Sequence, residues 1–162
     1  MNPLDDIITD IIKREGGAKT TNDPKDKGGR TQFGIAEHSN PAAWADGKVT
    51  EAEARAIYLQ KYVKGPGFDK IAHQRLQHQL IDFAVLSGPA IAIQKLQEAV
   101  GADIDGILGP DTLAKVNALD GVVVGNKLVA ARVKMICKIV VKHPSQLRFL
   151  SGWVNRSLDF LV

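Results

Sequence analysis

A glutamate stands at the end of the first expected helix, where an apolar side chain would fit the pattern. Five aliphatic residues recur at helical spacing over residues 3–15: Leu4, Ile7, Ile8, Ile11 and Ile12. At about 100° per residue, Glu15 returns to the middle of this stripe. Partial burial and the negative end of the helix dipole both disfavour a charge there. The position therefore favours a protonated acid, which is the group that a glycosidase uses to protonate a leaving oxygen.

The segment after this helix supplies candidates for a second catalytic group. It reads EGGAKTTNDPKDKGGRTQFGI from Glu15 to Ile35 and lacks helical periodicity. Because glycosidases place a second carboxylate across the scissile bond, Asp26 is the best candidate, with Asp23 behind it. The glycines allow the backbone to approach a substrate closely. The competing interpretation is a helix that frays before Glu15, followed by a plain connecting loop.

This segment resembles a known signature. The similarity lies in Glu15-Gly16-Gly17, Asn22-Asp23-Pro24, Asp26, Gly28-Gly29, Thr31 and Gly34-Ile35. They are similar to the E-G-G…N-D-P-x-D-x-G-G-x-T-x-x-G-I pattern of glycoside hydrolase family 108, the phage-type lysozymes. LQEAVGADIDGILGPDTLAKV, from Leu96 to Val116, resembles the motif of the predicted peptidoglycan-binding region that accompanies this family. FLSGWVNRSLDF resembles the family's closing helix.

The resemblance implies a muramidase that cleaves the β-1,4 bond between N-acetylmuramic acid and N-acetylglucosamine, with Glu15 as general acid. By analogy with the Glu, Asp, Thr triad of other phage lysozymes, Asp26 would orient or deprotonate the water and Thr31 would hydrogen-bond it. The side chain of either residue could instead hydrogen-bond to backbone groups of its own loop. Two other functions stay open: a lytic transglycosylase, which needs no positioned water, and a non-catalytic cell-wall binding module.

The same resemblance implies a phage or prophage endolysin, hence a bacteriolytic and antimicrobial protein. Its N-terminus has acids where a secretory signal would have basic residues. We therefore expect synthesis in the host cytoplasm without a signal peptide, followed by release through a holin-like pore to periplasmic peptidoglycan.

Several residues are candidates for contacts with sugar. We expect Phe33 to form part of a cleft wall and Gly29 to let the backbone approach the sugar closely. Tyr62 is expected to offer a flat surface on which a sugar ring can stack. The family's D-x-x-V-N-S-G motif occurs here as DFAVLSG from residue 82, with leucine in place of the asparagine, while Asp82 and Ser87 remain. Asp82 is expected to be a substrate contact or, more simply, a buried acid that loop amides satisfy.

The periodicity predicts a mainly α, lysozyme-like fold with a central buried helix over 75–87 and at most a small β-hairpin, over 30–37. Further helices are expected at 50–62, 90–100, 110–119, 122–142 and 145–161. We predict a catalytic region over 1–88 and a helical peptidoglycan-binding region over 89–162, packed as one compact unit.

A net charge of +3 and a pI near 9.0 favour acidic polymers as partners. Peptidoglycan is the expected partner, with a monomeric protein and no nucleic acid. The basic helix over 122–142 could meet an anionic membrane surface, although a solvated face on a structural helix is the simpler interpretation. Cys137 is expected to be a small buried hydrophobe. The four histidines lack metal-ligand spacing, so no metal and no cofactor are expected.

Overall fold

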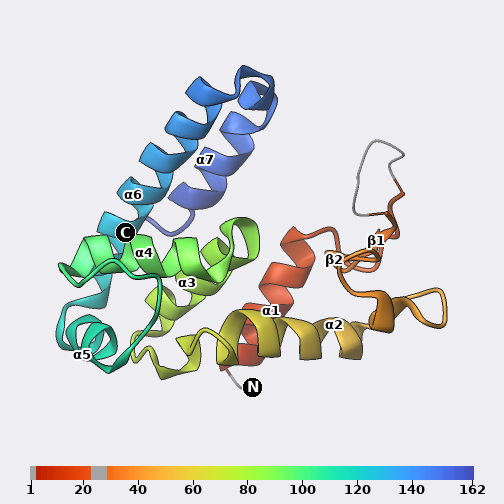
Figure 1. Cartoon of the computed structure of the whole chain (residues 1–162), viewed down its shortest axis with the longest axis horizontal. Coiled ribbons are helices and arrows are strands. Elements are labelled where there is room, and N and C mark those ends of the chain that lie inside the picture. Colours follow the sequence, from red (N-terminus) through yellow and green to blue (C-terminus); the bar gives the residue numbers. More distant parts are fainter. Residues whose placement is uncertain (1–2, 23–28) are drawn as a thin grey trace. The chain divides into compact units, whose positions relative to one another are not determined.

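The computed structural model describes residues 3–22 and 29–162, and the chain divides into two compact units, Met1–Gly65 and Pro66–Val162. Within the described residues, the secondary structure consists of helices and one two-stranded antiparallel sheet (Figure 1). The mainly α fold class with a small hairpin is therefore confirmed. The division into functional regions at residue 88 stays a prediction.

The first unit begins with α1 (Pro3–Arg14), which buries the aliphatic face that its sequence predicts. Ile7, Ile8, Ile11 and Ile12 are at most 6% exposed. Acids in its first turn and Lys13 and Arg14 in its last turn complement the helix dipole.

After α1 the unit continues with a hairpin and a second helical segment. The hairpin is formed by β1 (Thr31–Gln32) and β2 (Ile35–Ala36), and a short 3-10 helix over Pro41–Trp44 follows. α2 (Glu51–Tyr58) starts at a capping box made by Thr50 and Glu53, and a π-helix over Leu59–Lys64 extends it.

The second unit is built around α3 (Gln74–Ser87), whose residues Leu80, Ile81, Phe83 and Ala84 are 0% exposed. It packs against α4 (Pro89–Val100) and α6 (Gly121–Lys142), while α5 (Pro110–Ala118) contacts α4 and α6. α7 (Leu150–Leu158) returns alongside α6 (Figure 1). The central buried helix predicted over 75–87 is thus confirmed.

Two predictions in this unit are wrong. The helix expected over 145–161 is a 3-10 helix over Pro144–Phe149 followed by α7, in keeping with the frequency of 3-10 turns at helix starts. Cys137 is exposed. Its neighbour Ile136 is buried, and one residue further along α6 the side chain has turned by about 100°, away from the packed stripe.

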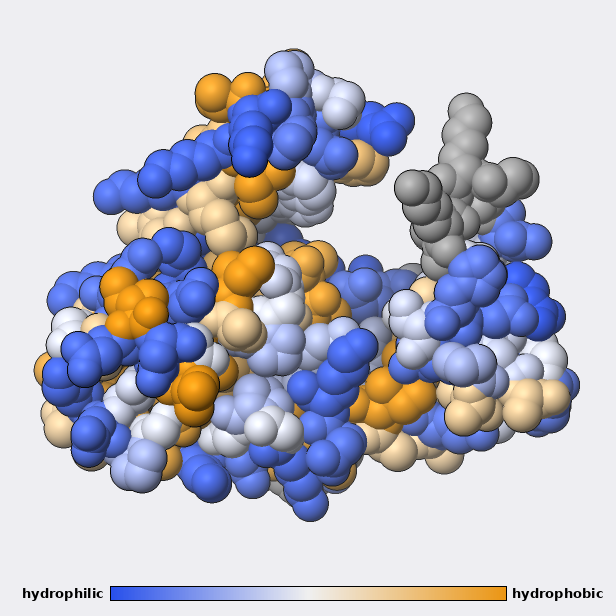
Figure 2. Space-filling model, in the orientation of Figure 1, coloured by the Kyte–Doolittle hydropathy of each residue, from blue (hydrophilic) through white to orange (hydrophobic). Residues whose placement is uncertain are grey.

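Hydrophobic side chains on the viewed face of the second unit are scattered among hydrophilic ones (Figure 2). The exposed aliphatic residues of the second unit include Ile104, Ile107 and Leu119, whichever face they lie on, and single exposed aliphatic residues are normal on a protein surface. Among the described residues, none of the helices combines the length and the apolar run that crossing a bilayer needs.

Candidate active site

The end of α1 fixes the backbone of Glu15. The Glu15 N–H still donates to the Ile11 carbonyl at 2.9 Å, so helical bonding reaches this residue. The Gly17 N–H then donates to the Ile12 carbonyl at 3.0 Å, with φ of 96° at Gly16 and 59° at Gly17. Glycine adopts these values without the penalty that a Cβ would bring. Glu15 is partly buried, so the alternative of a helix that frays before it does not hold.

The turn of the hairpin lies against this helix end. Thr31 pairs with Ala36 and Gln32 with Ile35, which leaves Phe33 and Gly34 as the two turn residues, at φ 51° and 75°. Positive φ at both positions is the type I′ requirement. The backbone of Phe33 is held on both sides: its N–H donates to the Gly17 carbonyl at 2.9 Å, and its carbonyl accepts from the Tyr58 hydroxyl at 3.0 Å. These bonds offset the strain of a phenylalanine at positive φ, about 1–2 kcal/mol.

Gly34 lies directly beside the aliphatic stem of Glu15. A Cβ placed at Gly34 would come within 2.9 Å of the Glu15 Cβ and 3.2 Å of its Cγ, and it would also collide with the Tyr58 hydroxyl. The side chain of Glu15 is thus positioned by the hairpin turn as well as by its own helix. Gly34 belongs to the signature and Tyr58 is an aromatic of the following helix, but their positioning role is not visible without the packing.

Replacing Gly34 with alanine is expected to lower hydrolytic activity more than tenfold, because the new methyl group displaces Glu15 and small displacements of catalytic groups are costly. Gly47 is the matched control: its φ is 84°, and an added Cβ would meet nothing within 4 Å. Gly47→Ala carries similar backbone strain without touching Glu15. Turbidity assays on peptidoglycan, with thermal melts of both variants, separate the two effects. Equal activity in both variants would mean that Gly34 does not position Glu15.

Thr31 lies in the same unit, on the strand that leads into this turn. Its N–H donates to the Thr21 carbonyl and its carbonyl accepts from the Thr21 N–H, both at 2.8 Å. Thr31 is partly buried. Asp26 and its alternative Asp23 lie outside the described residues. The catalytic assignments of Glu15, Asp26 and Thr31 therefore stay predictions.

The base of the hairpin is closed by an ion pair. Arg30 donates to the Glu37 carboxylate from Nε at 2.9 Å and from Nη2 at 2.8 Å, and its guanidinium lies 4.7 Å from the Trp44 ring centroid. The hydrogen bond from Arg30 lowers the pKa of Glu37 and raises that of Arg30. The contribution of Glu37 to stability is thus present above its unfolded-state pKa and is lost as pH falls through the lowered value.

Gly29 approaches His38 closely: a Cβ at Gly29 would lie 3.2 Å from the His38 Nε2.

The aromatic candidates differ in exposure. Phe33 is 8% exposed, and its role as a cleft wall stays a prediction. Tyr62 is partly buried, with its ring centroid 5.7 Å from that of Tyr58, and its contact with sugar stays a prediction.

Asp82 is fully buried in the second unit, at 0% exposure. It accepts from Arg132 Nη1 at 2.8 Å and from Arg156 Nε at 2.8 Å. The prediction of loop-amide partners is wrong, because α6 and α7 bring two guanidinium groups over this face of α3. The contact of Asp82 with substrate stays a prediction. Ser87, at the end of α3, lines a hollow of about 290 Å³ together with Leu86 and Trp153, and its predicted role stays a prediction.

Within residues 3–22 and 29–162, no three His, Cys, Asp or Glu side chains gather closely enough to hold a metal ion.

Comparison with known proteins agrees with this geometry. Residues 8–88 match the family described as "Glycosyl hydrolase 108", and residues 91–158 match the "Predicted Peptidoglycan domain". The structure of Brucella abortus SagA is similar over 97% of this chain and 94% of its own, with 30% sequence identity and a TM-score of 0.70. No curated protein matches the chain in sequence.

The fold and the two matched regions define a glycoside hydrolase that carries a peptidoglycan-recognising region. The chain belongs to the glycosyl hydrolase 108 family, as the resemblance of its signature indicates. It is a peptidoglycan hydrolase, and peptidoglycan is its partner.

Proposed function

We propose that the protein is an N-acetylmuramidase that cleaves the β-1,4 bond between N-acetylmuramic acid and N-acetylglucosamine, with Glu15 as the general acid. The glutamate protonates the leaving oxygen of the glycosidic bond as that bond breaks. Asp26 and Thr31 act on the opposite face of the sugar, where the aspartate orients or deprotonates a water and the threonine hydrogen-bonds it.

The observation that supports this proposal is the way in which Glu15 is held in place. Its backbone is held by the last turn of α1, and its stem lies on Gly34, in a turn that is tied to Gly17 and Tyr58. An acid catalyst must be held in one geometry by the groups around it, since a misplaced donor transfers its proton poorly. Helix end, hairpin and α2 together supply that support.

Mass spectrometry of the muropeptides released from purified sacculi tests the proposal. Hydrolysis by a muramidase is expected to release fragments that end in a reducing N-acetylmuramic acid, which borohydride converts to the alcohol. Reducing N-acetylglucosamine ends would place the cut at the other glycosidic bond. Anhydromuramic ends, lighter by one water, would identify a lytic transglycosylase.

A non-catalytic cell-wall binding module is the alternative from another class, and the match of residues 91–158 to a peptidoglycan domain is the observation that favours it. Under that alternative the wild type would sediment with sacculi and release no fragments. The same digest therefore decides between binding alone and cleavage.

We further propose a phage or prophage endolysin that acts as a monomer and is released from the host cytoplasm through a holin-like pore. The likeness of the Glu15 to Ile35 segment to phage-type lysozymes supports this role. Cells that express the protein in the cytoplasm should then lyse only after their inner membrane is permeabilised, and lysis without permeabilisation would contradict the release step.

A further inference from the structure

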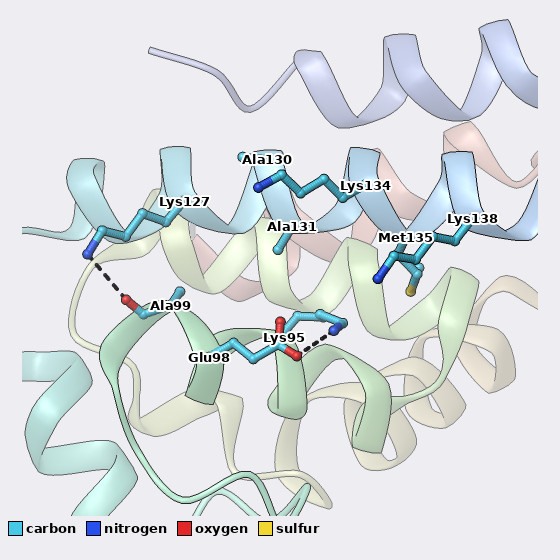
Figure 3. A pocket seen from close by; sticks show the side chains of 9 residues that line it. All are labelled: Lys95, Glu98, Ala99, Lys127, Ala130, Ala131, Lys134, Met135 and Lys138. Carbon is cyan, nitrogen blue, oxygen red and sulfur yellow. Dashed lines mark hydrogen bonds and ion pairs between the residues drawn. The ribbon is translucent and has the colours of Figure 1, made fainter.

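A basic groove runs between α4 and α6 in the second unit, with a volume of about 500 Å³ (Figure 3). Four lysines and one glutamate line it, so it carries an excess of three positive charges: Lys95, Lys127, Lys134, Lys138 and Glu98. The rest of its lining consists of three alanines, at positions 99, 130 and 131, and Met135. The groove is thus rich in ammonium groups and has one large apolar side chain.

The lysines of α6 form a row. They are spaced seven and four residues apart, which places them on one face of the helix. In Figure 3, Lys127 and Lys138 reach from α6 toward α4 near the two ends of the groove, and Lys134 runs along α6 between them. Eleven residues of α-helix separate the first from the last, a length of about 16 Å.

Two of these ammonium groups are available to a ligand. Lys95 pairs with Glu98 at 2.6 Å, and Lys127 donates to the Ala99 carbonyl at 3.4 Å. Lys134 and Lys138 are exposed, and within the described part of the chain they form neither an ion pair nor a hydrogen bond. Like charges held close together in a concave surface raise the local positive potential and attract an anion.

We propose that this groove binds the free carboxylates of the stem peptides of peptidoglycan. The proposal rests on peptidoglycan being the partner of this protein and names the part of the polymer that the second unit recognises. In intact peptidoglycan the stem peptides are the source of free carboxylates, because N-acetylglucosamine is neutral and the lactyl carboxyl group of N-acetylmuramic acid is bound to the peptide as an amide. An extended peptide of about five residues spans about 16–18 Å, which matches the row of lysines. Its carboxylates can then pair with Lys134 and Lys138 in turn.

A membrane surface fits the groove less well. Helices that lie on anionic bilayers present large apolar side chains beside their lysines, so that these can enter the acyl region. Here the lysines flank three alanines and a single large apolar side chain, Met135, in a concave surface, which a flat bilayer does not reach but an extended peptide does.

Binding of the full chain to purified sacculi tests the proposal. All proteins carry Glu15→Gln, so that the sacculi are not digested during the measurement. The groove variant adds Lys134→Gln and Lys138→Gln. The matched control adds Lys70→Gln and Lys142→Gln, which removes the same charge from two exposed lysines that do not line the groove. Each protein is titrated onto intact sacculi, onto sacculi whose carboxylates have been converted to amides with a carbodiimide and ammonia, and onto vesicles containing anionic lipid.

The groove variant is expected to bind intact sacculi at least tenfold more weakly than the control, which stays within twofold of its parent. Binding to intact sacculi should fall with added salt, since exposed ion pairs are screened. Groove variant and control should bind the amidated sacculi equally. Equal binding of both variants to intact sacculi, full affinity of the parent for amidated sacculi, or a loss seen only with vesicles would each overturn the proposal. None of these outcomes bears on cleavage, which the muropeptide digest reports separately.

Discussion

Glu15→Gln is expected to lower the rate of peptidoglycan hydrolysis by at least 100-fold and by up to about 10⁴-fold, the range that a positioned general acid contributes. Glutamine keeps the volume of the side chain and its contact with Gly34, but it has no acidic proton for the leaving oxygen. The loss should therefore appear in kcat, measured as clearance of a peptidoglycan suspension and as muropeptide release. Binding to sacculi and the melting temperature should change little.

Glu51→Gln is the matched control for this prediction. Glu51 lies in the same unit, at the start of α2, where it pairs with Arg55 on the surface. Removing its charge should leave activity within twofold of the wild type, because an exposed ion pair contributes little to stability. If Glu15→Gln retained wild-type clearance, the assignment of the acid would be wrong.

Asp82→Asn is expected to lower the free energy of unfolding by about 3–5 kcal/mol, because it removes one member of a buried ion network and leaves charge uncompensated. Arg132 is 2% exposed in its side chain, so the guanidinium that Asp82 neutralises has little access to water. In a protein of this length, such a loss corresponds to a drop in Tm of about 10 °C. Denaturant titration followed by circular dichroism measures it.

Two further substitutions define what the network does. Arg156 is 16% exposed in its side chain, so Arg156→Gln should destabilise less than Asp82→Asn, with part of the loss recovered by hydration. Asp69→Asn changes an exposed aspartate of the same unit and should fall within about 0.5 kcal/mol of the wild type. A loss in Asp82→Asn as small as that of Asp69→Asn would show that the two guanidinium groups do not depend on this carboxylate.

The network also explains how three helices of the second unit are joined. Asp82 lies on α3, while its partners lie 50 and 74 residues further along, on α6 and α7. The residues near Asp82 in the sequence do not predict that it pairs with these two arginines. From the sequence, the two arginines are expected only to belong to a basic helix and to the closing helix. The aspartate is expected to accept hydrogen bonds from loop amides. Only the packing of α6 and α7 over one face of α3 brings the three charges within hydrogen-bonding distance.

Features that depend only on near neighbours along the chain follow from the amino-acid sequence. The aliphatic period of α1, the glycines that end it, the capping box of α2 and the apolar run of α3 each act within a few residues, so helix positions and the place of Glu15 follow from local rules. The family signature is equally local, because it consists of residue types at short spacings.

Which side chains meet across helices and strands depends on how these elements pack together. In the folded chain Phe33 is buried, Cys137 is exposed and Gly34 lies beside the side-chain stem of Glu15. Lysines of α4 and α6 line one groove. The physical reason is that periodicity fixes the direction of a side chain relative to its own helix or strand. Whether that direction leads to solvent, to a partner charge or to a catalytic group depends on the element packed against it.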